Sequence, residues 1–234
     1  MRLAGLDIFR GYAILLMVVF HFSFDINNFH VIEFDIRHGL FWKYFRYFIV
    51  SMFVFSAGMS IYLANRDVIN YKKVLKRSAL LAGASLLVTI GSYTQFPNTW
   101  IYFGILHFFL FSTIFGLFFI RIPKVAFIVG VVIIAGYNFG FIHMHWLFHY
   151  LQPILHLPIK YTQDLANIIP WFGVFLLGVS FVQSRFFDLA FNNEFFNRKG
   201  RVNRSFDFLG RHSLIIYLIH QPILFGFFML LQVV

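Results

Sequence analysis

Apolar stretches long enough to cross a lipid bilayer recur along this chain of 234 residues. A membrane-spanning helix needs about 20 mostly apolar residues, with a range of about 17–25. About seven stretches satisfy this requirement. They are residues 8–27, 43–64, 76–94, 100–120, 124–141, 168–184 and 212–233. The pattern predicts an all-α, polytopic integral membrane protein with about seven transmembrane helices and a single domain over residues 1–234.

The stretch 142–160 is also apolar, but Pro153 and Pro158 interrupt it. We therefore expect a short interfacial or re-entrant segment here and no further span. The segment carries four histidines: His143, His145, His149 and His156. Two of them have the i, i+4 spacing of metal ligands on a helix, but no acidic residue lies between them and no second histidine box exists. We interpret them as interfacial histidines and expect no metal.

The composition excludes several protein classes. Hydrophobic residues make up 60% of the chain and charged residues 12%, against about 25% charged in soluble domains. This excludes an intrinsically disordered chain and disfavours a soluble enzyme. The net charge of +10 lies in short clusters between apolar runs, which indicates membrane topology signals and no nucleic-acid partner. The absence of cysteine excludes disulfides, thiolate catalysis and thiolate metal sites.

The basic residues predict the orientation of the spans. With the N-terminus in the cytoplasm, 15 of the 19 Lys and Arg fall on the cytoplasmic side; the exceptions are Arg37, Lys43, Arg46 and Lys160. An eighth span would leave the basic segment 185–211 outside. The distribution therefore predicts seven spans in an N-in/C-out arrangement. Gly136 and Gly140 form one G-x-x-x-G pattern, a signal for helix packing.

Ionisable residues inside the bilayer are costly and often functional. His21 and Asp25 lie in the outer half of the first predicted helix at i, i+4 spacing. They share a helix face, so the carboxylate could orient the imidazole and raise its basicity. The alternative is a structural hydrogen bond that locks this helix to a neighbour. We favour a functional role.

Other polar residues at depth have two interpretations each. Asp7 and Arg10, at i, i+3, are interpreted as an ion pair, or as an arginine that reaches the interface. His107 and His220 lie mid-helix on two further spans, where a satisfied buried histidine is the ordinary expectation for either one alone. Together with His21 they are three mid-membrane histidines on three helices, which favours a functional role. Pro222 removes a backbone donor near His220 and loosens that helix.

Five segments in order resemble a known family. They are LDIFRGYAILLMVVFHFSFD at 6–25, FVFSAGMSI at 53–61, FGILHFF at 103–109, PWFGVFLLGV at 170–179 and LGRHSLIIYLIHQPI at 209–223. Together they resemble the heparan-α-glucosaminide N-acetyltransferase catalytic-domain family. The Arg10…His21 spacing also resembles the first-helix motif of the broader transmembrane acyltransferase superfamily. That resemblance implies a catalytic role for His21 and a donor-holding role for Arg10.

The resemblance leaves the identity of the base open. In the animal lysosomal members an asparagine stands at the position of His21, and a key histidine lies in the first luminal loop. The nearest residue in this chain is His38. We therefore take His21, Asp25, His38 and His220 as candidate catalytic residues, with histidine as general base.

The resemblance further implies transfer of an acyl group, acetyl in the first instance, from cytoplasmic acyl-CoA to an outer acceptor. A cell-envelope glycan or glycolipid is the expected acceptor class, in a bacterial inner (cytoplasmic) membrane, with membrane lipids and a homo-oligomer as further partners. Basic clusters at 72–77 and 198–204 could bind the phosphates of the donor, although positive-inside topology explains most of them. The candidate donor-binding residues are Arg10, Lys72, Lys73, Lys76, Arg77 and His107.

Two other function classes remain open. A membrane electron-transfer protein could bind b-type haem through two of the histidines His21, His107 and His220. A small transporter without chemistry is the other class, although the chain has no repeat symmetry and no paired broken helices. A di-iron oxidase is disfavoured, because it would need several histidine boxes and the chain has no second one.

Overall fold

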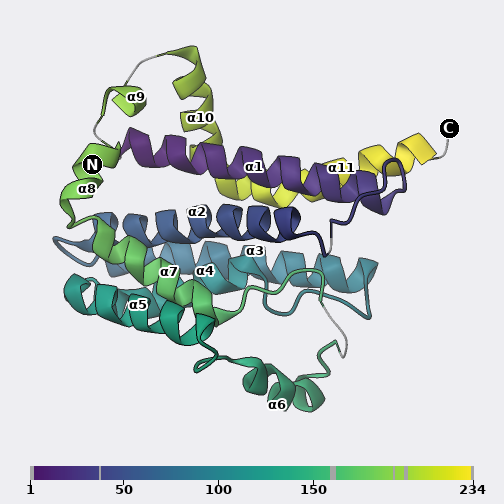
Figure 1. The fold of residues 1–234 in the computed structure, drawn as a ribbon, viewed down its shortest axis with the longest axis horizontal. Helices are drawn as coiled ribbons and strands as arrows, with labels where there is room; N and C mark the ends of the chain where they lie inside the picture. Colours follow the sequence, from purple (N-terminus) through teal and green to yellow (C-terminus); the bar gives the residue numbers. More distant parts are fainter. Residues whose placement is uncertain (1–2, 37, 159–161, 192, 198–199, 233–234) are drawn as a thin grey trace. The chain divides into compact units, whose positions relative to one another are not determined.

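A computed structural model describes residues 3–36, 38–158, 162–191, 193–197 and 200–232, which form an all-helical protein (Figure 1). Within these ranges the extended backbone pairs only as one isolated bridge, Phe103 with Leu165. Arg2, Arg37, Lys160, Arg198 and Lys199, which entered the topology argument, lie outside the described residues. The helices are α1 (Ala4–Asn28), α2 (Leu40–Asn65), α3 (Tyr71–Gln95), α4 (Ile105–Gly116), the short 3-10 helix η1 (Leu117–Phe119), α5 (Pro123–Asn138), α6 (His145–Leu155), α7 (Ile168–Phe181), α8 (Arg185–Phe191), α9 (Glu194–Asn197), α10 (Arg201–Arg211) and α11 (Ser213–Gln232).

Among the described residues, four helices are long and apolar enough to cross a membrane: α1, α2, α3 and α11. Helices α7 and α8 meet the same requirement only as a pair, bent by 90°. Two shorter apolar helices are Ile105–Phe119 and α5. The prediction of an all-α integral membrane protein is confirmed, whereas the seven crossings and their orientation stay predictions.

The chain folds into two compact units. One contains both ends of the sequence, Met1–Ser56 and Arg185–Val234, and the other is Ala57–Ser184.

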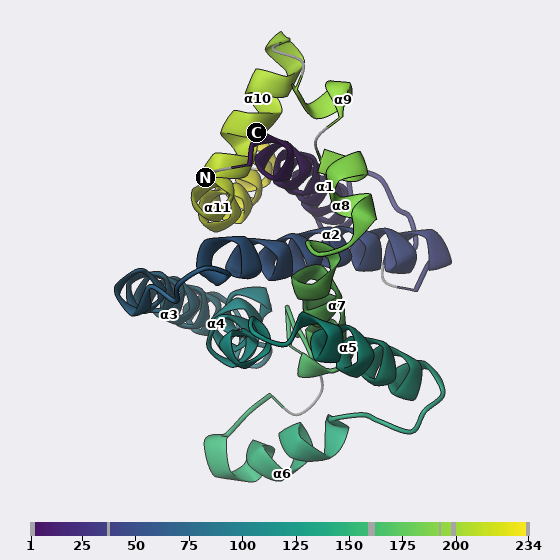
Figure 2. The ribbon, with the colours of Figure 1, turned by 90° about the vertical axis from the view of Figure 1, so that its left-hand side faces the viewer.

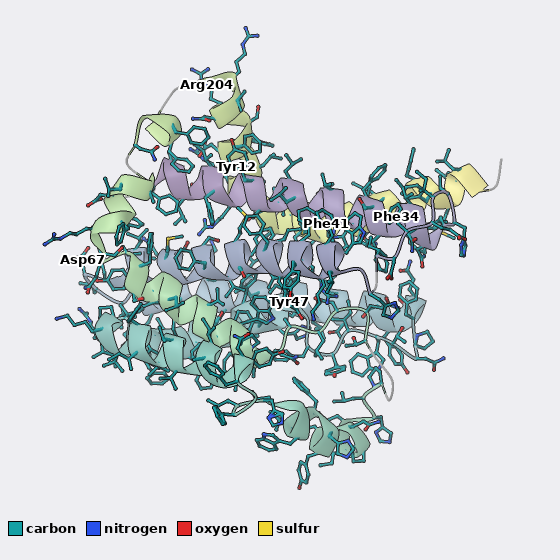
Figure 3. All side chains as sticks on the ribbon, in the orientation of Figure 1. Tyr12, Phe34, Phe41, Tyr47, Asp67 and Arg204 are labelled. Carbon is teal, nitrogen blue, oxygen red and sulfur yellow. The ribbon has the colours of Figure 1, made fainter. Side chains whose placement is uncertain are left out.

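In the terminal unit, α10 crosses α1 in the opposite direction and at very close range. Gly11 faces the backbone of Phe206, and Gly210 faces the backbone of Asp7. The ring of Tyr12 stacks on that of Phe206 at this crossing, with 3.9 Å between the centroids and an angle of 21° (Figure 3). One glycine on each helix allows the two backbones to approach closely, because no Cβ at these positions holds them apart.

Helix α11 lies alongside α1 and runs in the same direction (Figures 1 and 2). The direction follows from ring contacts: His21 meets His220, and Phe29 meets Phe228 further along both helices. Ile14, Met17 and Ile49 form a buried apolar cluster in this unit, with Ile216 and other apolar side chains packed around them. The C-terminal half of α1 is therefore held against α11, and its N-terminal half against α10.

In the internal unit, α5 and α7 pack in opposite directions through a second glycine pair. The backbone of Gly130 faces that of Gly173 at close range. The prediction from the G-x-x-x-G pattern is wrong in its choice of residues. Gly136 faces the side chain of Ile142 just beyond its own helix. Gly140 lies after α5 with φ of +76°, and a Cβ added there would meet no other atom within 4 Å. Gly140 thus serves a turn, where positive φ favours glycine.

Helix α4 begins at Ile105, five residues later than the predicted span that starts at residue 100. Asp164 explains the difference, because its Oδ2 accepts a hydrogen bond from the Ile105 backbone N–H at 3.0 Å. The backbone N–H of Gly104 donates to Nδ1 of His107 at 3.2 Å. These side chains satisfy the free N–H groups of the first helical turn and fix its start.

The predicted short segment at 142–160 contains α6, an 11-residue helix that ends at Leu155 and is followed by His156 in the left-handed conformation. Its placement at a membrane interface stays a prediction. The charge of the segment 185–211 does not predict the helices α8, α9 and α10 that it contains. Helix α10 has Phe206 and Gly210 on the side facing α1, whereas Arg204 extends away from α1 and is exposed (Figure 3).

Candidate active site between α1 and α11

Two histidines from opposite ends of the sequence meet between α1 and α11. The imidazole rings of His21 and His220 have centroids 4.7 Å apart and planes inclined at 76°, an edge-to-face contact. His220 is 7% exposed and His21 is partly buried. The sequence identified both residues as candidates, and the structure places them together.

The backbone sets the tautomer of both rings. Nδ1 of His21 lies 3.0 Å from the carbonyl oxygen of Met17, and Nδ1 of His220 lies 2.6 Å from that of Tyr217. A carbonyl oxygen only accepts, so each Nδ1 must carry the hydrogen that it donates. In the neutral ring, Nε2 is then the basic nitrogen. Nε2 of His220 is buried and has no hydrogen-bond partner among the described residues.

Asp25 lies one helical turn beyond His21 and is 1% exposed. Its carboxylate accepts from the side-chain amide of Gln221, with Nε2 at 3.0 Å from Oδ1 and 3.3 Å from Oδ2. The expected pairing of Asp25 with His21 is not among the hydrogen bonds of the described residues, because the imidazole bonds to the backbone one turn earlier. Asp25 is oriented from the neighbouring helix instead.

Gln221 is the site residue that the sequence reasoning missed. It follows His220 directly. Two consecutive side chains of α11 therefore contact α1, His220 at His21 and Gln221 at Asp25. The signal was present as a polar pair, His-Gln, before Pro222 in an apolar helix. Polar side chains at such depth are expected to find a partner on a neighbouring helix.

Arg10 lies on the same helix, three turns before His21. Its Nη1 donates to Oδ1 of Asp7 at 3.1 Å, and its side chain is 22% exposed. The ion-pair interpretation of these two residues is confirmed. Arg10 is about 16 Å from His21 along the helix axis, at 1.5 Å per residue.

His38 lies in the loop between α1 and α2, with its side chain 87% exposed. Its Nδ1 faces Oδ1 of Asp35 at 3.3 Å, and the structure shows no contact between His38 and the His21–His220 pair. Close by in the sequence, a shallow hollow of about 420 Å³ is lined by Asn27, His30, Glu33, Phe34 and Asp35. This hollow lies at the C-terminal end of α1.

His107 belongs to the internal unit, where both of its ring nitrogens are occupied. Nδ1 accepts from the Gly104 N–H, and Nε2 lies 3.2 Å from the hydroxyl of Thr89. The Thr89 hydroxyl itself donates to the carbonyl of Ile101 at 2.9 Å. Since that hydroxyl has one hydrogen, His107 must donate from Nε2, and the ring ties α3 to the start of α4. The structure therefore supports a structural role for His107.

The basic residues Lys72, Lys73, Lys76 and Arg77 lie in the first two turns of α3, in the internal unit. The side chain of Asn70 caps this helix by accepting from the Lys73 N–H at 3.0 Å. The three lysines are exposed. Positive side chains beside the positive end of a helix dipole create a local field that attracts anions.

The residues fit haem poorly. The rings of His21 and His220 touch, which leaves no room for a porphyrin between them, and His107 has no free ring nitrogen. Groups of three or more metal-ligating side chains are absent from the described part of the chain.

Comparison with known proteins supplies the family. No curated protein and no solved structure gives a significant match. Residues 2–222 match the family described as Heparan-alpha-glucosaminide N-acetyltransferase, catalytic. The matched range contains Arg10, His21 and Asp25 and extends just past His220 and Gln221. Because the match covers nearly the whole chain, the protein belongs to the heparan-alpha-glucosaminide N-acetyltransferase catalytic family, a family of membrane acetyltransferases.

Proposed function

We propose that the protein transfers an acetyl group from cytoplasmic acetyl-CoA to a glycan or glycolipid acceptor on the outer side of a bacterial cytoplasmic membrane. One observation carries this proposal: two histidines face each other inside a membrane helix pair, each with Nδ1 held by a backbone carbonyl. This arrangement leaves Nε2 of each ring as the nitrogen that can accept a proton. General base catalysis needs such a nitrogen in a fixed position.

The course of the helices supports the proposed topology of seven spans, N-in and C-out. Because α1 and α11 run in the same direction, both cross the membrane the same way, and the number of spans counted from one to the other is odd. The helix directions in the internal unit agree with this order. Gly58 of α2 meets Phe175 of α7, and Tyr62 meets Gln183 further along, so these two run in the same direction, as a second and a sixth span would.

Arg10 is proposed to hold the donor. It lies near the inner end of α1, about 16 Å along the helix from His21, so a long, flexible acyl arm can extend from one residue to the other. Its ion pair with Asp7 orients the guanidinium, whose planar fork suits phosphate groups. Lys72, Lys73 and Lys76 would attract the anionic donor to the cytoplasmic surface.

The proposed reaction uses one histidine as base. Its Nε2 takes the proton from the acceptor O–H or N–H while the acceptor atom bonds to the acetyl carbon. The same imidazolium returns the proton to the departing sulfur as the carbon–sulfur bond breaks. Either His21 or His220 is proposed for this role. His38 is exposed, and we propose that it meets the acceptor in the outer loop. Positioned proton transfer contributes about 10²–10⁴-fold to the rate.

The test is transfer of labelled acetyl groups by the purified protein in proteoliposomes loaded with acetyl-CoA, with a panel of amino sugars and envelope glycans outside. We expect His21→Ala and His220→Ala to lose about 10²-fold or more in kcat, and His38→Ala to change mainly the KM of the acceptor. His149→Ala, an exposed histidine of α6, is the matched control. Wild-type turnover in both the His21 and the His220 variants would refute the site assignment, and a wild-type protein without turnover on any acceptor would refute the proposed reaction.

A further inference from the structure

We infer that Gln221 is a positioning residue: by binding Asp25 of α1 it holds α11 in the register that brings the imidazoles of His220 and His21 together. The inference rests on the proposed function only for its effect on the reaction. The contact between the two helices is a property of the fold.

The evidence is a pair of adjacent contacts between the same two helices. His220 reaches the ring of His21, and the next residue, Gln221, reaches the carboxylate of Asp25 one turn further along α1. Rotation of α11 about its axis, or a slide along α1, would break both contacts at once. The ring contact is weakly directional, whereas the amide donates to two fixed oxygens at 3.0 and 3.3 Å. The amide–carboxylate contact is therefore the one that sets the register.

The chemistry of the pair determines which way the amide faces. Both oxygens of a carboxylate accept, so the NH₂ group of Gln221 must point at Asp25 and its Oε1 must point away. Oε1 is buried without a partner among the described residues. An orientation that leaves one amide atom unsatisfied persists because the buried carboxylate would otherwise lose its donor. Asp25 and Gln221 thus depend on each other.

Helix α11 needs such an anchor at this position. Pro222 follows directly and contributes no backbone N–H, so the helix loses one of its own hydrogen bonds there. A helix loosened at a proline bends readily. A side-chain link from the residue before the proline to α1 restricts that bending where the two histidines meet.

The first test measures acetyl transfer with side chains of conserved shape. Gln221→Leu removes the donor, and we expect kcat to fall about 10- to 100-fold while the KM for acetyl-CoA stays the same. The double variant Asp25→Asn, Gln221→Glu reverses donor and acceptor with the same side-chain lengths, so it should recover kcat to within about 3-fold of wild type. Gln95→Leu, at an exposed glutamine of α3, is the control. Wild-type kcat in Gln221→Leu, or a reversed pair as slow as Gln221→Leu, would overturn the inference.

The second test is independent of activity. The chain has no cysteine, so His21→Cys with His220→Cys introduces a single pair of thiols at the ring contact. We expect oxidative cross-linking of this pair with Gln221 present, a several-fold lower yield with Gln221→Leu, and recovery with the reversed pair. Absent cross-linking in the parent, or equal yields throughout, would overturn the inference. If the cysteine variants cross-link as expected but the wild-type protein, with both histidines in place, transfers no acetyl group, the proposed function alone would be refuted.

Discussion

The crossing of α1 and α10 provides a sharp test of how this unit is held together. Gly210 packs so closely on α1 that a Cβ at this position would lie 1.7 Å from the carbonyl oxygen of Asp7, where ordinary contact begins at 3.4 Å. The substitution Gly210→Ala would force α10 away from α1 by about 1.7 Å, because the obstructing atom belongs to the backbone and no rotamer change relieves it. Gly11 meets the backbone of Phe206 in the same way, so the strain would extend along the crossing.

The expected loss of stability can be estimated. Overpacking costs about 1–3 kcal/mol, and the better helix propensity of alanine returns up to about 1 kcal/mol. With the full return the net loss is up to about 2 kcal/mol, which corresponds to a fall in melting temperature of up to about 8 °C for a chain of this size. Because the obstructing atom is backbone, the upper end of this range is the expected one.

Thermal unfolding in detergent, followed by the fluorescence of the four tryptophans, measures this difference. Gly226→Ala in α11 is the matched control, since nothing lies within 4 Å of a Cβ at that position. It should unfold at the wild-type temperature or slightly above it. If Gly210→Ala unfolded at or above the temperature of Gly226→Ala, the close backbone contact between α1 and α10 would be refuted.

Three further predictions concern the polar residues. His107→Ala should lower the melting temperature by several degrees, because the Thr89 hydroxyl and the Gly104 N–H lose their hydrogen-bond partner, which costs about 1–3 kcal/mol of stability. An unchanged melting temperature with a raised KM for acetyl-CoA would instead indicate that His107 binds the donor. Arg10→Gln should raise the KM for acetyl-CoA about 10-fold and Arg10→Lys less, measured by initial rates; equal KM values in all three proteins would exclude Arg10 from the donor site. Lys76→Gln should raise the same KM at low salt only, and a difference that persists at about 0.5 M salt would contradict an electrostatic role.

The long helices were the most predictable part of the fold. Apolar runs of about 20 residues place α1, α2, α3 and α11 within a few residues of their observed bounds. Their ends depend on more distant residues. The start of α4 follows from a hydrogen bond to Asp164, 59 positions away, and no local pattern contains that information.

The packing of the helices was less predictable. Gly130 meets Gly173, and Gly11 and Gly210 meet the backbones of neighbouring helices. None of these positions belongs to a G-x-x-x-G pattern. To predict a glycine contact between two helices, one must know which helices are neighbours. The spacing of residues within one helix shows only which of them share a face.

The candidate active site was only partly predictable from the sequence, for the same reason. The sequence identified His21 and His220 because an ionisable residue in an apolar helix is conspicuous. Their pairing, and the partner of Asp25, depended on the packing of α11 against α1. The i, i+4 spacing suggested that Asp25 binds His21, but a histidine ring in a helix can also reach the backbone carbonyl one turn back, and this is what His21 does.

The link between Asp25 and Gln221 also has a consequence for biosynthesis. The two residues are 196 positions apart, and a ribosome adds about 5–20 residues per second. The first helix therefore waits about 10–40 s before the donor for its buried carboxylate emerges. During that time α1 is a membrane helix with an unpaired acidic group at depth, which makes it a natural client for the insertion machinery and its chaperones. A nascent chain arrested before α11 should accordingly keep α1 exposed to those factors, and release it only when synthesis proceeds past Gln221.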